Sequence, residues 1–302
     1  MFQRPFNVSR AQAFPASLVL VEYTLLFLLC AARPVYPADE IPGDMTMTFF
    51  PPGDLYPQYA ADPHRLGFGV QWLSFRDAQI PDSGDSRVAI RAGGRFGIVR
   101  VHPSGQEDRG LQVSLEGGFN AQFDADHSLD NIGWDGRYGL IVTTAQSHEW
   151  AFKFGVLHDS SHVGDEYMER TGRKRIGYTR HELAAGANWL PDKRFRTYLE
   201  AAWGYELSNE QLQEPGRVQL GLEYGATPLP GTGRIGWYGA ADLSAMEERD
   251  WRVDRSLQIG LVTHAGGRTW RCGIEWYRGR PPMGEFFAYT EEYVSLGVWV
   301  DL

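Results

Sequence analysis

The chain has 302 residues, with 29 Lys and Arg against 38 Asp and Glu, which gives a formal charge of −9. Because phosphate binding needs clustered basic residues, this balance argues against a nucleic-acid-binding protein. The chain holds 35 Gly, 10 Trp, 14 Tyr and 16 Phe. With a mean hydropathy of −0.36, this composition excludes a bundle of membrane-spanning helices and favours a β-rich protein. The two cysteines are too few for a disulfide scaffold or a zinc site.

The N-terminal segment has the pattern of a secretory signal peptide. Two arginines precede an apolar run over residues 18–30, and small residues follow it. We expect residues 1–38 to form the signal peptide, with cleavage after Ala32 or after Ala38. A single transmembrane anchor is the alternative, but Glu22 interrupts the run and leaves the apolar stretch short for a bilayer. The sequence therefore predicts export from the cytoplasm.

From residue 65 onward, apolar and polar residues alternate in twelve runs. Such alternation predicts β-strands with one apolar face, and no run has a helical period. On the run 195–207, for example, the alternation places Leu207 on the apolar face and Glu206 on the polar face. Residues 39–64, rich in Pro and Gly, precede the strands as an irregular periplasmic arm. The predicted strands cover residues 65–75, 87–101, 111–124, 134–144, 149–158, 176–190, 195–207, 217–226, 234–245, 256–264, 269–278 and 292–302.

These strands fit an antiparallel up-and-down transmembrane β-barrel over residues 65–302 better than a soluble sandwich. The runs have roughly ten residues or more, long enough for a tilted membrane crossing, and short and long connections alternate as in outer-membrane barrels. The apolar faces carry aromatic residues toward the ends of the runs, as membrane interfaces do. The opposite faces carry too many charges for a dry core, and we expect these charges to form a luminal network. Its proposed members are Lys153, Arg180, Glu182, Arg196 and Glu200.

One segment combines a base with a nucleophile. His158 and Ser160 continue the outward face of the strand before them, and an imidazole can accept the proton of a nearby hydroxyl. The pair would lie at the external end of the barrel, beside the outer leaflet. We expect the residues around it to form a loop, whose further candidate members are Asp159, Ser161, His162, Gly164, Asp165 and Glu166.

The stretch His158-Asp159-Ser160 resembles the His-x-Ser motif of outer-membrane phospholipase A and of lipid A 3-O-deacylase. The resemblance implies that His158 is the base and Ser160 the nucleophile on the lipid-facing rim of a barrel. Those families add an orienting Asn or Glu from the next strand. Here the outward polar residues of that strand are Thr179 and His181, so His181 is the candidate third member. Asp165 or Glu166 from the loop are the alternatives.

A wider resemblance covers nearly all of the mature chain. The segments Phe50-Pro51-Pro52-Gly53 and Met283-Gly284-Glu285-Phe286-Phe287, together with the stretch from His158 to Tyr167, are similar to the bacterial family called domain of unknown function 1207. That family is exported and has β-barrel-like sequences, without an established activity. The resemblance implies the fold and leaves the function open.

We therefore expect an outer-membrane protein that hydrolyses lipid esters, with no cofactor and no support in the sequence for calcium. The alternative is a non-catalytic structural or transporting barrel whose lumen is plugged by charges, the motif being an external loop. A metal site made by His158, His162, Asp165 and Glu166 is a further hypothesis. The expected partners are outer-membrane lipid and, through the alternating C-terminal strand, the barrel-assembly machinery; nucleic acid is not among them.

Overall fold

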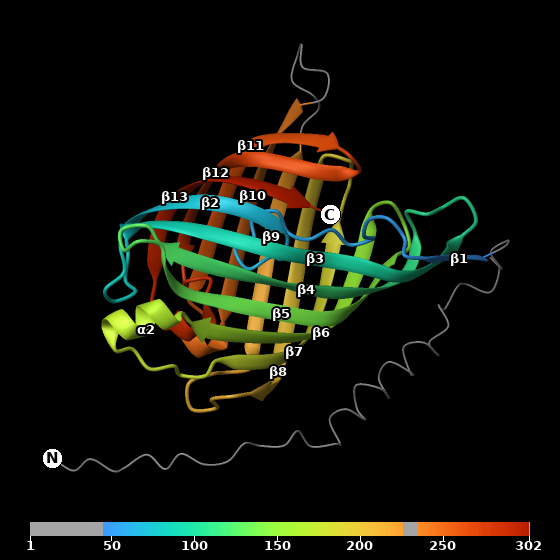
Figure 1. Cartoon of the computed structure of the whole chain (residues 1–302). Helices are drawn as coiled ribbons and strands as arrows, with labels where there is room; N and C mark the ends of the chain where they lie inside the picture. The colour runs from blue at the N-terminus through green and yellow to red at the C-terminus, as the bar shows by residue number, and fades with distance from the viewer. Residues whose placement is uncertain (1–44, 226–234, 302) are drawn as a thin grey trace. The chain divides into compact units, whose positions relative to one another are not determined.

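The computed structural model describes residues 45–225 and 235–301, and these form an all-β structure (Figure 1). The predicted signal segment, with Cys30 in it, lies outside the described residues. Twelve long strands make up the barrel: β2 (Phe68–Asp77), β3 (Ser86–Pro103), β4 (Gly110–Asp124), β5 (Asp130–Ala145), β6 (Trp150–Val163), β7 (Thr179–Trp189), β8 (Phe195–Leu207), β9 (Gly216–Gly225), β10 (Ile235–Met246), β11 (Val253–Ala265), β12 (Arg268–Gly279) and β13 (Glu291–Asp301).

Each strand pairs antiparallel with its neighbours in sequence, and the last strand returns to the first. The closure is made by β13 against β2, with Val300 opposite Phe68 and Leu296 opposite Trp72. On its other side β2 pairs with β3, so that no barrel strand is left with a free edge. The structure confirms the predicted twelve-stranded up-and-down barrel. In the described part of the chain, no helix is long and apolar enough to cross a membrane.

Three local features differ from the expected arrangement. A short strand, β1 (Met45–Phe49), lies within the predicted arm and pairs with the far end of β3. Strand β6 continues to Val163, so the expected loop from residue 159 is strand at first. The loop that follows contains a helix, α2 (Asp165–Thr171), which the sequence did not predict because no run has a helical period. Seven residues make only two turns, too few for a periodicity to be recognised.

The barrel strands present an apolar face outward and a polar face inward. Exposed outward residues include Trp72, Trp150, Trp189, Trp237 and Trp270, which the sequence predicts for the apolar face. The inward face holds buried charges joined in ion pairs. Lys153 pairs with Glu200, Arg180 with Glu182 (2.9 Å), and Arg217 bridges Glu182 (2.5 Å) and Glu200 (2.8 Å). Pairing of this kind is what allows so many charges to be buried.

The arm before β2 lies against these inward-facing side chains. Tyr56 and Tyr59 are buried, and the Tyr59 ring stacks on Tyr198 at a centroid distance of 3.8 Å. The Tyr59 hydroxyl donates to Glu200 (2.7 Å), and the Ala60 backbone N–H donates to Glu223 (2.6 Å). The second half of the segment predicted as a periplasmic arm is therefore packed inside the barrel, where Figure 1 shows its blue trace among the strands.

Candidate functional site

The motif residues alternate between the two faces of β6. His158 and Ser160 lie on the outward face, partly exposed, whereas Asp159 and Ser161 point into the barrel. Neighbouring strands hold the outward pair on both sides. His158 is opposite Tyr138 of β5 and His181 of β7, and Ser160 is opposite Gly136 and Thr179 of the same two strands.

The His158 imidazole is held by two rings. It stacks on the ring of Tyr138 at a centroid distance of 4.5 Å, and His181 meets it edge-on at 4.4 Å. The His158 Nδ1 lies 3.1 Å from the His181 Nε2, within hydrogen-bonding distance. The structure thus brings two of the three predicted catalytic side chains into direct contact. Tyr138 is a contact that the sequence reasoning missed, since an outward tyrosine resembles any other interfacial aromatic residue.

Ser160 is next to His158 on the same face of the same strand. Two residues of a strand span roughly 6.6 Å, a separation that an imidazole can bridge to a hydroxyl. Among the described residues no hydrogen bond joins the two side chains, and Nε2 of His158 has no hydrogen-bond partner there. The residue opposite Ser160 on β5 has no side chain: a Cβ atom added to Gly136 would lie 3.5 Å from the Ser160 Oγ and 3.2 Å from the Trp134 Cζ3.

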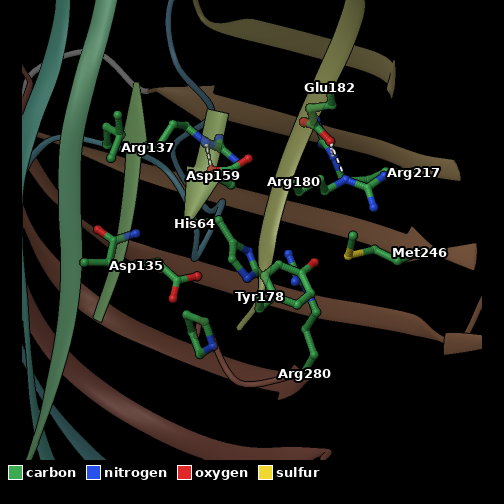
Figure 2. A pocket seen from close by; sticks show the side chains of 13 residues that line it. His64, Asp135, Arg137, Asp159, Tyr178, Arg180, Glu182, Arg217, Met246 and Arg280 are labelled. Atoms are coloured by element: carbon green, nitrogen blue, oxygen red, sulfur yellow. Dashed lines mark hydrogen bonds and ion pairs between the residues drawn. The ribbon is translucent and has the colours of Figure 1, made fainter. Parts of the chain in front are cut away.

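The inward residues of the motif anchor it from inside the barrel. Figure 2 shows Asp159 turned toward Arg137, which donates from Nε to the Asp159 Oδ1 at 2.6 Å. Ser161 accepts the backbone N–H of Glu285 at 2.8 Å and is buried. Both contacts fix the β6 backbone, and thereby the outward residues, on rigid strands rather than on a loop. They also explain why polar residues on both faces of this segment are compatible with a strand.

A cavity of about 30 Å³ lies on the inner side of this segment and is lined by His64, Asp135, Arg137, Asp159, Tyr178, Arg180, Glu182 and Arg280, among others (Figure 2). Its volume is enough for roughly two water molecules. Burial, aided by the charge of Arg280, lowers the pKa of His64 to about 3. His64 is therefore neutral in the folded protein at physiological pH. The cavity is too small for a lipid or a sugar.

The remaining motif residues have other surroundings. His162 faces outward and stacks on Trp134 at 4.2 Å. Gly164 precedes α2 at a point where a Cβ atom would come within 1.8 Å of the Asn131 carbonyl oxygen. Asp165 is exposed and forms an ion pair with Arg175 (2.9 Å), and Glu166 is exposed as well. Neither carboxylate contacts His158 among the described residues. Of the three candidates for the third catalytic member, His181 is the one that contacts His158.

The sequence also suggested a metal site and a luminal charge network. Within the described ranges, no group of three or more His, Cys, Asp or Glu side chains is arranged to hold a metal ion. Of the five proposed members of the luminal network, four meet through Arg217. The fifth, Arg196, pairs instead with Glu223 (3.2 Å) and lies near the rings of Tyr56 and Tyr59 in the arm.

The model of the family described as "Protein of unknown function (DUF1207)" matches residues 37–301. The chain belongs to the DUF1207 family. This result confirms the wider resemblance drawn from the arm, the motif and the C-terminal segments. No curated protein matches the sequence.

Solved structures with the same fold include outer-membrane enzymes. Outer membrane phospholipase A from Escherichia coli has a TM-score of 0.53 at 11% identity, over 78% of the DUF1207 chain and 90% of the enzyme. The Salmonella typhi phospholipase dimer with bound calcium has the same TM-score and identity, over 82% and 95%. LpxR from Salmonella typhimurium has a TM-score of 0.40 at 8% identity, over 78% and 100%. At these identities, the phospholipase structures establish the barrel fold and leave the chemistry of this chain to its own residues.

Proposed function

We propose that this DUF1207 protein lies in the outer membrane and hydrolyses ester bonds of outer-leaflet lipids. The observation that carries the proposal is the outward row formed by Ser160, His158 and His181, in which the His158 Nδ1 contacts His181 and Nε2 is left for the serine. This is the arrangement of a base that is oriented at one nitrogen and accepts a proton at the other.

The reaction would proceed in two balanced halves. The Ser160 oxygen attacks the ester carbonyl carbon while His158 Nε2 accepts the hydroxyl proton, and the lipid alcohol leaves with that proton. Water then attacks the acyl-serine carbonyl carbon while His158 accepts one of its protons. The bond to the Ser160 oxygen breaks, that oxygen takes the proton back from His158, and the fatty acid leaves. His181 would be a positioning residue, since it contacts the base and not the reacting atoms.

The height of Ser160 on the barrel supports a lipid substrate. Trp150 at the other end of β6 is exposed and lies near Trp189 of β7, at a ring distance of 6.3 Å, as in an interfacial aromatic belt. Ten residues separate Trp150 from Ser160. At about 3.3 Å per residue and a tilt of about 40°, they rise about 25 Å, the height of the apolar band of such barrels. Ser160 would therefore lie at the opposite interface, where lipid ester bonds lie.

The filled interior argues against the transporting alternative. The arm, with Tyr56 and Tyr59, and the luminal ion pairs occupy the space that a pore needs. We also propose, as a separate expectation, that β13 is the signal for the barrel-assembly machinery. Its Leu296 and Val298 alternate outward with buried residues between them.

The test is lipid hydrolysis by purified, refolded protein in vesicles of phospholipid and, separately, of lipopolysaccharide. Ser160→Ala should abolish the release of fatty acid. Ser74→Ala is the matched control, because Ser74 is exposed and, like Ser160, lies three residues before the end of its strand. The heat-modifiable gel shift of each variant reports folding. If Ser160→Ala releases fatty acid at the wild-type rate, the proposed hydrolase site is wrong.

A further inference from the structure

Strand β8 contains a bulge that changes which of its residues face outward. Along β7 and β8, Glu182 pairs with Gly204, but the preceding His181 pairs with Glu206, so Tyr205 is the extra residue. Bulges of this kind redirect side chains, and they occur often beside active sites. Gly204 is opposite the inward-facing Glu182, and a Cβ atom on Gly204 would lie 2.8 Å from the Leu207 Cδ2. Leu207 therefore points inward as well. The simple alternation, which places Leu207 outward and Glu206 inward, is wrong at this point.

The bulge places Glu206 in line with the candidate site. Residues directly opposite each other on antiparallel strands share a face, with Cβ atoms about 5 Å apart. Tyr138, His158, His181 and Glu206 are opposite one another on the four consecutive strands β5 to β8. Glu206 is exposed on this outward face. No hydrogen bond joins it to His181 in the described residues, and the His181 Nδ1 lies 3.5 Å from the His158 Nδ1, so the contact requires rotation of both the Glu206 side chain and the His181 ring.

The tautomers that catalysis requires point to a role for this carboxylate. For Nε2 of His158 to accept the serine proton, its Nδ1 must carry a hydrogen, which it donates to the His181 Nε2 at 3.1 Å. His181 must then carry its own hydrogen on Nδ1. A ring N–H in such a chain is fixed by an acceptor, and carboxylates are common acceptors for histidine. Glu206 is the carboxylate opposite His181 on the same face.

We infer that Glu206 is a positioning residue that acts through His181, so that a relay of Glu206, His181 and His158 orients the base for Ser160. This inference rests on the proposed function. The charged and titratable groups that face the two imidazoles from the packed strands are Tyr138 of β5, Tyr205 and Glu206 of β8. Asp159 lies next to His158 on β6 but points inward to Arg137. Glu206 is thus the carboxylate that lies on the outward face with them.

The test compares Glu206→Gln with the wild type in the vesicle assay across pH. Glu210→Gln is the matched control, since Glu210 is an exposed carboxylate in the loop after β8. We expect Glu206→Gln to lower kcat at least about tenfold, the loss typical of removing a group that orients a functional histidine. We also expect the acidic limb of its kcat/KM profile to move to lower pH. The amide removes a negative charge that stabilises the protonated base, and a merely structural role would not move this limb. Glu206→Asp should restore part of the wild-type profile.

The outcomes separate this inference from the proposed function. An inactive Ser160→Ala variant with a shifted and slower Glu206→Gln variant supports both. An inactive Ser160→Ala variant with a Glu206→Gln variant equal to wild type in kcat and in pH profile overturns the relay and leaves the hydrolase. A fully active Ser160→Ala variant overturns both.

Discussion

Gly136 offers a sharp test of access to the serine, because it is the residue opposite Ser160 on β5 and has no side chain. A Cβ atom at this position would lie 3.5 Å from the Ser160 Oγ and 3.2 Å from the Cζ3 of Trp134, whose ring stacks on His162. The methyl groups of a valine would extend about 1.5 Å further. They would fill the space about 3 Å from the hydroxyl that an ester carbonyl must enter. We therefore expect Gly136→Val to lower kcat/KM for vesicle lipid by about 100-fold, the loss typical of a reacting group misplaced by about 1 Å.

The same substitution should not weaken the fold. Glycine weakens a strand and valine favours one, so the free energy of unfolding in urea should stay within about 1 kcal/mol of the wild-type value. Gly239→Val is the control, because Gly239 is on the barrel strand β10 and its added Cβ meets nothing closer than 3.9 Å. Wild-type hydrolysis by a folded Gly136→Val variant would refute the reasoning about access to Ser160.

Three further predictions concern the interior. The pKa of His64 is lowered to about 3, so between pH 6.5 and 3 the unfolded chain binds a proton that the folded chain does not. The free energy of unfolding should therefore fall by about 2 kcal/mol from pH 7.5 to pH 5. In His64→Gln it should fall by clearly less over the same range. An equal pH dependence in the two proteins would contradict this. Arg87 donates to both Glu291 oxygens at 2.8 and 2.7 Å, and both residues are buried. Arg87→Met should lower the free energy of unfolding in urea by about 3–5 kcal/mol, because it leaves the buried carboxylate without a partner. A loss below about 1 kcal/mol would contradict this. Planar-bilayer recordings should show no steady conductance, and a stable open channel would contradict the filled lumen.

The strands were predictable because a membrane barrel repeats one rule over many residues. Apolar residues at every second position, as in β4 from Leu111 to Phe123, are required wherever one face meets lipid and the other a polar interior. The same rule places His158 and Ser160 on one face without knowledge of the structure. It also explains why a chain with a negative mean hydropathy forms a membrane-type barrel, since half of each strand faces inward.

The rest could not be predicted, because it depends on contacts between distant residues. The arm around Tyr56 and Tyr59 has no periodicity, and only its contacts with Glu200 and Tyr198 place it in the lumen. The bulge at Tyr205 inserts one residue, which reverses the faces of Glu206 and Leu207 without leaving a pattern in the sequence. The hydrogen bond between His158 and His181 likewise depends on the register of β6 and β7.

Covalent labelling tests the central claim most directly. A long-chain alkylsulfonyl fluoride reacts with an activated serine when the hydroxyl oxygen attacks sulfur, fluoride leaves and the base accepts the proton. The account predicts one adduct per chain, mapped by peptide mass spectrometry to Ser160 and strongly reduced in His158→Ala. Ser161, buried against the Glu285 backbone, and the exposed Ser74 should stay unlabelled. A folded protein in which Ser160 is labelled no faster than Ser74 would contradict the account.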